Sequence, residues 1–286
     1  MTEEFSPPQL SNWAALWRII AFAALWIAGS SLALAGIAAV WPSGAGIGIE
    51  GQIADALSEL VGALLASAVL LRFADRSGWT AIGLGKEALS PMALSLGAAL
   101  GGGTIALASL VLLGTHQMLL RASPATGWLD AAGLTAVLLL PAAFAEELVM
   151  RGYVFWIARR KWGWKWAAIG TSIFFGLLHI FNPGANAQSL SMVIIAGLFL
   201  AGVFLLTRSL YAAGVCHFAW NWVMAGGLHT PVSGQSLPAP NYTITDNGPD
   251  WLTGGRWGPE GGAAAGAAMI IIIWYLYTRH LRRMES

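Results

Sequence analysis

Long apolar runs recur along this chain of 286 residues, and they constrain its fold more than any other feature. A helix needs about 20 residues to cross the hydrocarbon core of a bilayer, where only helices and closed barrels satisfy the backbone polar groups. The chain is 57% hydrophobic and 10% charged, whereas soluble domains carry about 25% charged residues. We therefore predict an all-α fold, a polytopic membrane helix bundle with about eight transmembrane helices. The runs fall roughly at 16–40, 52–71, 92–114, 129–157, 166–182, 189–207, 210–228 and 262–278.

The basic residues predict the orientation of these helices. Lysine and arginine concentrate in alternate connections, namely 72–86, 159–165, Arg208 and the C-terminal tail. The opposite connections carry only Arg121 and Arg256. Because cytoplasmic loops carry an excess of lysine and arginine, this alternation predicts both termini in the cytoplasm. It fits eight spans and does not fit seven.

The polar stretches predict a simple domain organisation. No repeat or second domain is evident, so residues 1–286 are expected to form a single membrane domain with a catalytic helix core at 129–228. Residues 229–261, rich in Pro, Gly, Asn and Asp, are expected to form an external loop. Net charge +1 leaves no basic stripe once the loop arginines are assigned to topology, which argues against nucleic acid as a partner. The lipid bilayer is the expected environment, and the single cysteine excludes an intramolecular disulfide.

Three ionisable residues, Glu146, Glu147 and Arg151, lie inside the fourth apolar run. Each such side chain near the centre of a membrane helix costs at least about 2.5–3.5 kcal/mol on insertion scales, so its default interpretation is functional. Glu147 and Arg151 are spaced i, i+4, which predicts an intrahelical ion pair that lessens the cost of burying both charges. Glu146 points about 100° away around the helix and is left without a local partner.

Polar side chains from other helices are predicted to reach the depth of Glu146. Counted from the basic connection at 159–165, Glu146 and His179 both lie about 20 Å from the cytoplasmic end of one helical hairpin. His217 and Asn221 share a helix face at about 13–20 Å depth. A carboxylate held near a histidine in a medium of low dielectric constant is a candidate general base. We therefore predict that these four residues form one site.

Three short motifs, in order along the chain, carry a resemblance to a known family. They are EExxxR from Glu146 to Arg151, FxxxH from Phe175 to His179, and HxxxN from His217 to Asn221. The ordered set resembles the CAAX protease and bacteriocin-processing family (CPBP, or Abi) of intramembrane proteases, whose eukaryotic members include the Ras-converting CAAX endopeptidase. The resemblance covers about 141–224, roughly a third of the chain.

The resemblance implies an intramembrane endopeptidase that hydrolyses a peptide bond of a membrane-associated protein or peptide. Carried over residue by residue, it implies that Glu146 and His179 activate the attacking water. It likewise implies that His217 and Asn221 stabilise the oxyanion. Three further motif residues are expected to brace the helices or to contact the substrate: Glu147, Arg151 and Phe175.

A metal-dependent mechanism is an alternative for the same site. Glu146, His179 and His217 are a candidate three-ligand zinc set with an open fourth position, and the family has often been labelled metalloprotease for that reason. We favour the glutamate-dependent mechanism, which needs no cofactor. The chain has no His-Glu-x-x-His helix of the unrelated zinc-dependent CAAX proteases.

Two other classes of function stay open on sequence grounds. The first is a noncatalytic membrane protein of the same fold, acting in bacteriocin immunity or as a scaffold. The second is a secondary transporter, because buried Glu, His and Arg also build proton relays. A transporter predicts internal repeats with paired broken helices, and none is found. Many Ala, Gly and Trp residues and few lysines favour a bacterial inner membrane, whereas the substrate and the pathway do not follow from the sequence.

Overall fold

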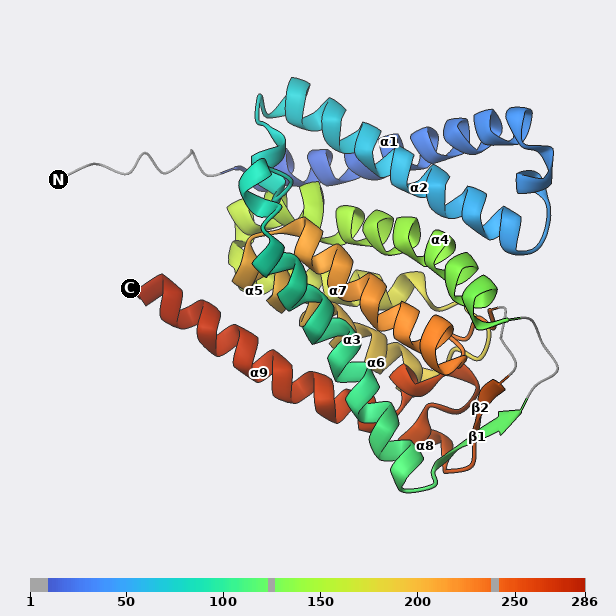
Figure 1. The fold of residues 1–286 in the computed structure, drawn as a ribbon. Helices are drawn as coiled ribbons and strands as arrows, with labels where there is room; N and C mark the ends of the chain where they lie inside the picture. Colours follow the sequence, from blue (N-terminus) through green and yellow to red (C-terminus); the bar gives the residue numbers. More distant parts are fainter. Residues whose placement is uncertain (1–9, 123–126, 238–241, 286) are drawn as a thin grey trace.

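The computed structural model describes residues 10–122, 127–237 and 242–285 as a bundle of long helices (Figure 1). The apolar runs predicted above coincide with helical segments, except that the last four residues of 166–182 form turns, and this confirms the all-α polytopic bundle. The long helices are α1 (Asn12–Val40), α2 (Ile49–Val69), α3 (Pro91–Gly114), α4 (Trp128–Glu147), α5 (Tyr153–Leu178), α6 (Ala187–Thr207), α7 (Leu210–Trp222) and α9 (Ala263–Glu285). A single short turn forms α8 (Asp250–Thr253).

Wider π-helical turns extend three of the long helices. They continue α2 through Leu70–Ala74, α4 through Leu148–Gly152 and α7 through Val223–Leu228. Within the described residues, six helical segments are long and apolar enough to cross a membrane, when α4 and α5 are taken as one segment. The count of eight spans and the cytoplasmic location of the termini therefore stay predictions.

Helix α5 is broken at Gly163, whose φ of 84° and ψ of 166° lie outside the helical region. Glycine adopts such a backbone conformation readily because it has no Cβ atom. Arg151 and Phe175 lie at equal sequence distances on either side of the break, and the Arg151 guanidinium is 5.1 Å from the centre of the Phe175 ring. The two arms of α5 are therefore antiparallel. The connection predicted at 159–165 is a reversal at a single residue rather than a loop.

Helix α4 lies at the centre of the bundle, packed between α2 and α7 (Figure 1). Helix α3 packs on the other side of α7 through two glycines, Gly97 and Gly101. A Cβ atom on Gly101 would lie 1.9 Å from the backbone oxygen of Cys216, and one on Gly97 would lie 2.3 Å from that of Ala212. Small residues at these positions permit the close helix approach that is common in bilayers. Helix α6 packs against both α5 and α9.

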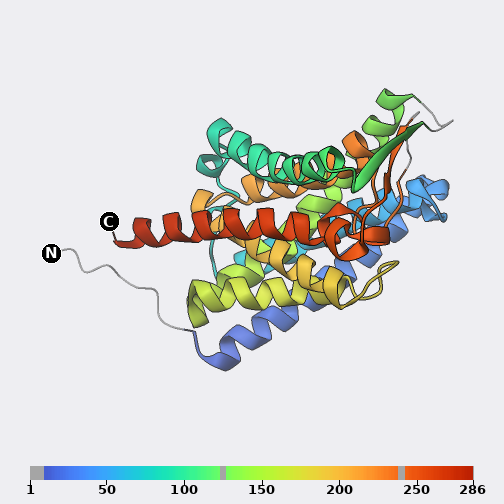
Figure 2. The same ribbon diagram turned by 90° about the horizontal axis from the view of Figure 1, so that it is seen from below.

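The two ends of the bundle differ in structure. Helix α1 begins and α9 ends at the same end, as Figure 2 shows from a second side. At the opposite end, strand β1 (Met118–Ala122) pairs antiparallel with β2 (Tyr242–Asp246), with Met118 opposite Asp246. The sequence prediction missed this two-stranded sheet, which organises part of the segment expected to be an external loop.

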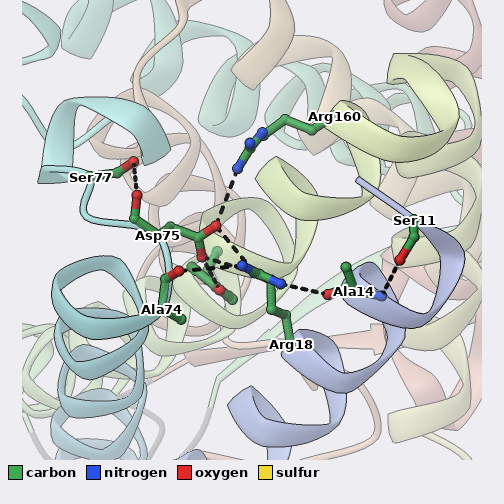
Figure 3. Close-up of polar contacts among 8 residues, drawn as sticks. Ser11, Ala14, Arg18, Ala74, Asp75, Ser77 and Arg160 are labelled. Atoms are coloured by element: carbon green, nitrogen blue, oxygen red, sulfur yellow. Dashed lines mark hydrogen bonds and ion pairs between the residues drawn. The ribbon is translucent and has the colours of Figure 1, made fainter. Parts of the chain in front are cut away.

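A buried carboxylate, Asp75, joins α1, α2 and α5 at the end of the bundle where α1 begins (Figure 3). Its oxygens accept hydrogen bonds from Arg18 Nε at 3.1 Å, from Arg160 Nη1 at 3.3 Å and from the hydroxyl of Tyr153. Arg18 also donates to the backbone oxygens of its own helix and of Ala74 at the end of α2. One carboxylate thereby fixes the relative positions of three helices.

Candidate active site

The two adjacent glutamates at the end of α4 point in different directions. The Glu147 side chain is 0% exposed and lies in the protein interior, whereas the Glu146 side chain is 34% exposed and lines a cavity. The π-helical turn that follows contains Arg151. Such turns are frequent at functional sites because they change the direction in which side chains project.

Glu147 and Arg151 form the predicted ion pair, with 3.0 Å between Arg151 Nη1 and Glu147 Oε1. The guanidinium also donates from Nη2 to the backbone oxygen of Gly197 at 2.7 Å, which ties α4 to α6. Its face lies against the ring of Phe175, a cation–π contact with the second arm of α5. Arg151 is fully buried, so these contacts replace its hydration.

His217 of α7 lies between the two glutamates. Its Nδ1 is 3.0 Å from Glu147 Oε1, and its Nε2 is 3.7 Å from Glu146 Oε2. An ionised carboxylate can only accept, so the His217 Nδ1 carries a proton that it donates to Glu147. The free nitrogen of the ring then faces Glu146, the residue that the sequence left without a local partner.

His179, at the end of α5, is held by its own backbone. Its Nδ1 is 2.8 Å from the carbonyl oxygen of Phe175, and a carbonyl can only accept, so Nδ1 is protonated. In the neutral ring the lone pair is therefore on Nε2. The Phe175 ring packs edge-on against His179 and His217, with ring centres 4.8 and 5.8 Å away. Phe175 thus orients both histidines.

The motif residues line a common cavity of about 350 Å³. Its walls include Glu146, His179, His217 and Asn221, the four residues predicted to form one site, together with Phe175. Pockets that bind small molecules and peptide side chains begin at about 300 Å³. Two other motif residues, Glu147 and Arg151, lie behind this wall and reach the cavity only through His217 and Phe175.

Residues 128–223 match the family model described as type II CAAX prenyl endopeptidase Rce1-like. This segment runs from α4 into the turn after α7 and contains all three motifs. The segment 128–223 is thus similar to this family and is named the Rce1-like core. The match, over roughly a third of the chain, confirms the resemblance to the CPBP family and supports a CAAX-type intramembrane endopeptidase in general. Comparisons with curated proteins and with solved structures gave no match.

Residues outside the Rce1-like core complete the cavity, and the sequence analysis missed them. Asp55 and Glu59 project into it from α2. Their signal in the sequence was the same as that of the glutamate pair, because both are carboxylates within an apolar run and one helical turn apart. Together with Glu146 and Glu260 they place four carboxylates around the cavity, and none of the described lining residues is lysine or arginine.

Glu260 closes the opposite side of the cavity from the segment expected to be an external loop. Its carboxylate accepts hydrogen bonds from Trp220 Nε1 at 3.0 Å and from the backbone nitrogen and hydroxyl of Ser233, both at 2.7 Å. Glu260 is 8% exposed. This contact joins residues 229–261 to α7 of the Rce1-like core. The sequence does not predict it, because the two partners are distant along the chain.

The three candidate zinc ligands do not form a metal site in this geometry. Within the residues that the structure describes, no three His, Cys, Asp or Glu side chains converge as a metal site requires. The candidate ligands Glu146, His179 and His217 line the same cavity, but their donor atoms do not converge on one point where a metal ion could bind.

Proposed function

We propose that this protein is an intramembrane endopeptidase that hydrolyses a peptide bond of a membrane-associated protein or peptide, in a bacterial inner membrane. The observation that carries the proposal is the shared cavity lined by Glu146, His179, His217 and Asn221 from three helices. The Rce1-like match over the same helices supports this class of enzyme.

Glu146 and His179 are the proposed pair that activates water. A water bound between the Glu146 carboxylate and His179 Nε2 meets two acceptors, because the Nδ1 proton of His179 is engaged by the Phe175 carbonyl. Transfer of its proton to Glu146 leaves the oxygen free to attack the scissile carbonyl. The same carboxyl group then returns the proton to the leaving amine, as general acid–base catalysis requires.

His217 and Asn221 are the proposed oxyanion donors. Asn221 offers its side-chain N–H groups, one helical turn from His217. Because the Nδ1 proton of His217 is given to Glu147, the ring donates to an oxyanion from Nε2 only in its doubly protonated form. The carboxylates of Glu147 and Glu146, at 3.0 and 3.7 Å from the ring nitrogens, supply the counter-charge for that form. Donors aimed at the developing charge in a dry site are worth a few kcal/mol each.

Glu147 and Arg151 are proposed as positioning residues. The Glu147 oxygen that holds the His217 ring is the same oxygen that pairs with Arg151. Arg151 is fixed in turn by the backbone of Gly197 and by the ring of Phe175. The pair thus sets the orientation of the imidazole without contacting the reacting bond.

The test is cleavage of a peptide library by the protein reconstituted in bilayers, compared with two variants. Glu146→Gln keeps the shape of the side chain and removes the base, so we expect hydrolysis to fall by about 10²- to 10⁴-fold. Glu50→Gln, a matched change on α2 outside the cavity, should leave the rate unchanged. A chelator arm with zinc add-back separates the glutamate mechanism from the metal alternative.

Equal rates in Glu146→Gln and the unsubstituted protein would remove Glu146 from the reaction. No cleavage of any peptide by the unsubstituted protein, with natural membrane peptides included, would favour the noncatalytic immunity or scaffold role over the protease.

A further inference from the structure

A second polar cavity lies far from the site above, at the end of the bundle where α9 ends. It has a volume of about 130 Å³. By the same measure a single water needs about 10–15 Å³, so the cavity has room for a larger polar group. Its polar lining comes from Arg159 of α5, Arg208 after α6, His280 of α9 and Thr80 of the connection between α2 and α3.

The two arginines of this cavity have no carboxylate partner in the described part of the chain. Their positive charges repel each other, and both act on His280. Within the described residues neither arginine forms an ion pair, whereas the nearby Arg18 and Arg160 share Asp75. Both arginines are exposed at the cavity, and the like charges that they gather there create a positive potential that attracts an anion.

His280 gives the second, independent sign of a ligand. The residue is 6% exposed, and its ring is held by a backbone hydrogen bond to Leu205 and by edge-on packing with Trp164, whose ring centre is 5.1 Å away. Its Nε2 has no hydrogen-bond partner. Buried polar side-chain atoms nearly always have a partner, so an orphan in the wall of a cavity indicates a group that the cavity receives.

The backbone at Gly83 closes the cavity against α6. Gly83 has φ of 77°, and a Cβ atom there would lie 2.8 Å from the Phe204 ring and 3.1 Å from the Arg208 backbone oxygen. The connection between α2 and α3 therefore packs directly on the end of α6. This packing holds Thr80 beside the arginines and makes the site part of the folded bundle.

From this geometry we infer that the cavity binds a phosphate group, supplied by the headgroup of an anionic lipid or by free phosphate. Arginine forks match phosphate oxygens in bidentate fashion, and His280, whose Nδ1 proton is given to Leu205, adds a third donor from Nε2 in the doubly protonated form that a bound anion favours. Basic pockets between membrane helices on the cytoplasmic side are typical sites for anionic lipid headgroups. The sequence predicts that this end of the bundle faces the cytoplasm, the leaflet side on which such lipids gather.

The test measures the thermal unfolding midpoint of the purified full chain in uncharged detergent. One arm titrates inorganic phosphate against chloride at equal ionic strength. The other titrates phosphatidylglycerol against diacylglycerol, which has the same tails and no phosphate. Each titration yields an apparent affinity, because a ligand that binds only the folded protein raises its midpoint.

Three double variants are compared. Arg159→Gln with Arg208→Gln should weaken the apparent affinity by about tenfold or more, because it removes charged donors to the phosphate. Arg279→Gln with Arg282→Gln makes the same change in net charge on the exposed side of α9 and should leave the affinity unchanged. Arg159→Lys with Arg208→Lys keeps the charge, loses the planar forks and should give an intermediate affinity.

A midpoint shift with phosphatidylglycerol alone assigns the site to a lipid headgroup, and a shift in both arms assigns it to phosphate in general. The inference is overturned if the midpoint shifts in neither of the two arms. It is equally overturned if the two glutamine variants lose affinity to the same extent, since that would reflect net charge and not a site. None of these outcomes depends on whether Glu146 takes part in hydrolysis.

Discussion

The buried charges of this protein form two clusters that differ in how completely they are satisfied. At the end of the bundle, the carboxylate of Asp75 receives donors from two arginines and a tyrosine. In the middle, Glu147 pairs with Arg151, and His217 lies between Glu147 and Glu146. There, Glu147 Oε2 and Arg151 Nε have no partner, although both side chains are fully buried.

The difference separates a cluster that stabilises the fold from a cluster that lies at the candidate active site. A polar network with every member satisfied rigidifies a protein, and the Asp75 cluster does so for three helices. An incompletely satisfied network is retained only where something requires it. In this chain such a network lies directly behind the cavity that the motif residues line.

Arg151→Met should destabilise the protein by about 3–5 kcal/mol, because it leaves Glu147 as a buried charge without its cation. The double variant Glu147→Leu with Arg151→Met should recover most of that stability, since an apolar pair of similar volume replaces the ions. Hydrolysis should not recover with it, because His217 has lost its acceptor. The free energy of unfolding in detergent and the cleavage rate, measured on the same samples, test this. Recovery of both quantities would show that Glu147 has no positioning role.

Asn221→Ala should lower the rate of hydrolysis by about 10²- to 10³-fold, as removal of one oxyanion donor does. The unfolding midpoint should change little, because no described hydrogen bond of the folded protein depends on the Asn221 side chain. Single-turnover cleavage kinetics measure the effect. An unchanged rate would remove Asn221 from the site while leaving the other residues in place.

Asp75→Asn should destabilise the protein by about 1.5–3 kcal/mol, the range for hydrogen bonds to charged groups, because Arg18 and Arg160 both lose their counter-ion. The rate of hydrolysis should be unchanged at temperatures where the variant is folded. Asp246→Asn, on an exposed strand position, is the matched control for stability. A loss of rate in Asp75→Asn that persists in the folded protein would contradict the division between the two clusters.

The smallest predicted effect depends on pH and concerns His229, which begins the segment 229–261. Burial lowers the pKa of His229 from its usual 6.5, and neither ring nitrogen has a partner. The neutral ring is therefore favoured in the folded protein, so its contribution to stability is present above pH 6.5 and is lost as the pH falls through the lowered pKa. The unfolding midpoint should fall between pH 7 and 5, and His229→Asn should flatten that part of the profile. An identical profile in the variant would assign the pH dependence to other groups.

Much of the bundle was predictable from the sequence because burial in lipid dictates it. Apolar runs of sufficient length fold as helices whatever their tertiary partners, and each predicted run is helical over most of its length. Depth along a helix follows from the rise per residue, which is why Glu146, His179, His217 and Asn221 were expected at one level before any contact was known. Their arrangement around one cavity agrees with that expectation.

The rotation of each helix about its own axis and the contacts between distant segments were harder to predict. Helical spacing assigned Glu147 to Arg151, but the second partner of Glu147 depends on how α7 turns toward α4, and that angle is set by packing. Strands of five residues leave little pattern among polar loop residues, so β1 and β2 were missed. Glu260 meets Trp220 only after the chain has folded. Asp55 and Glu59 did leave a signal, as carboxylates in an apolar run. The three motifs predicted a complete site without them, so this signal was not used.

The reversal at Gly163 has a consequence for how this chain can vary in length. The two arms of α5 meet at one residue, without a flexible connection between them. The direction in which a side chain of the second arm points is therefore fixed by the number of residues that separate it from Gly163. Insertion of a single residue between Gly163 and Phe175 would turn the outer part of that arm by about 100° and carry His179 out of the cavity. Length variation among functional proteins of this kind should therefore avoid the two arms and accumulate in the connections at the bundle ends.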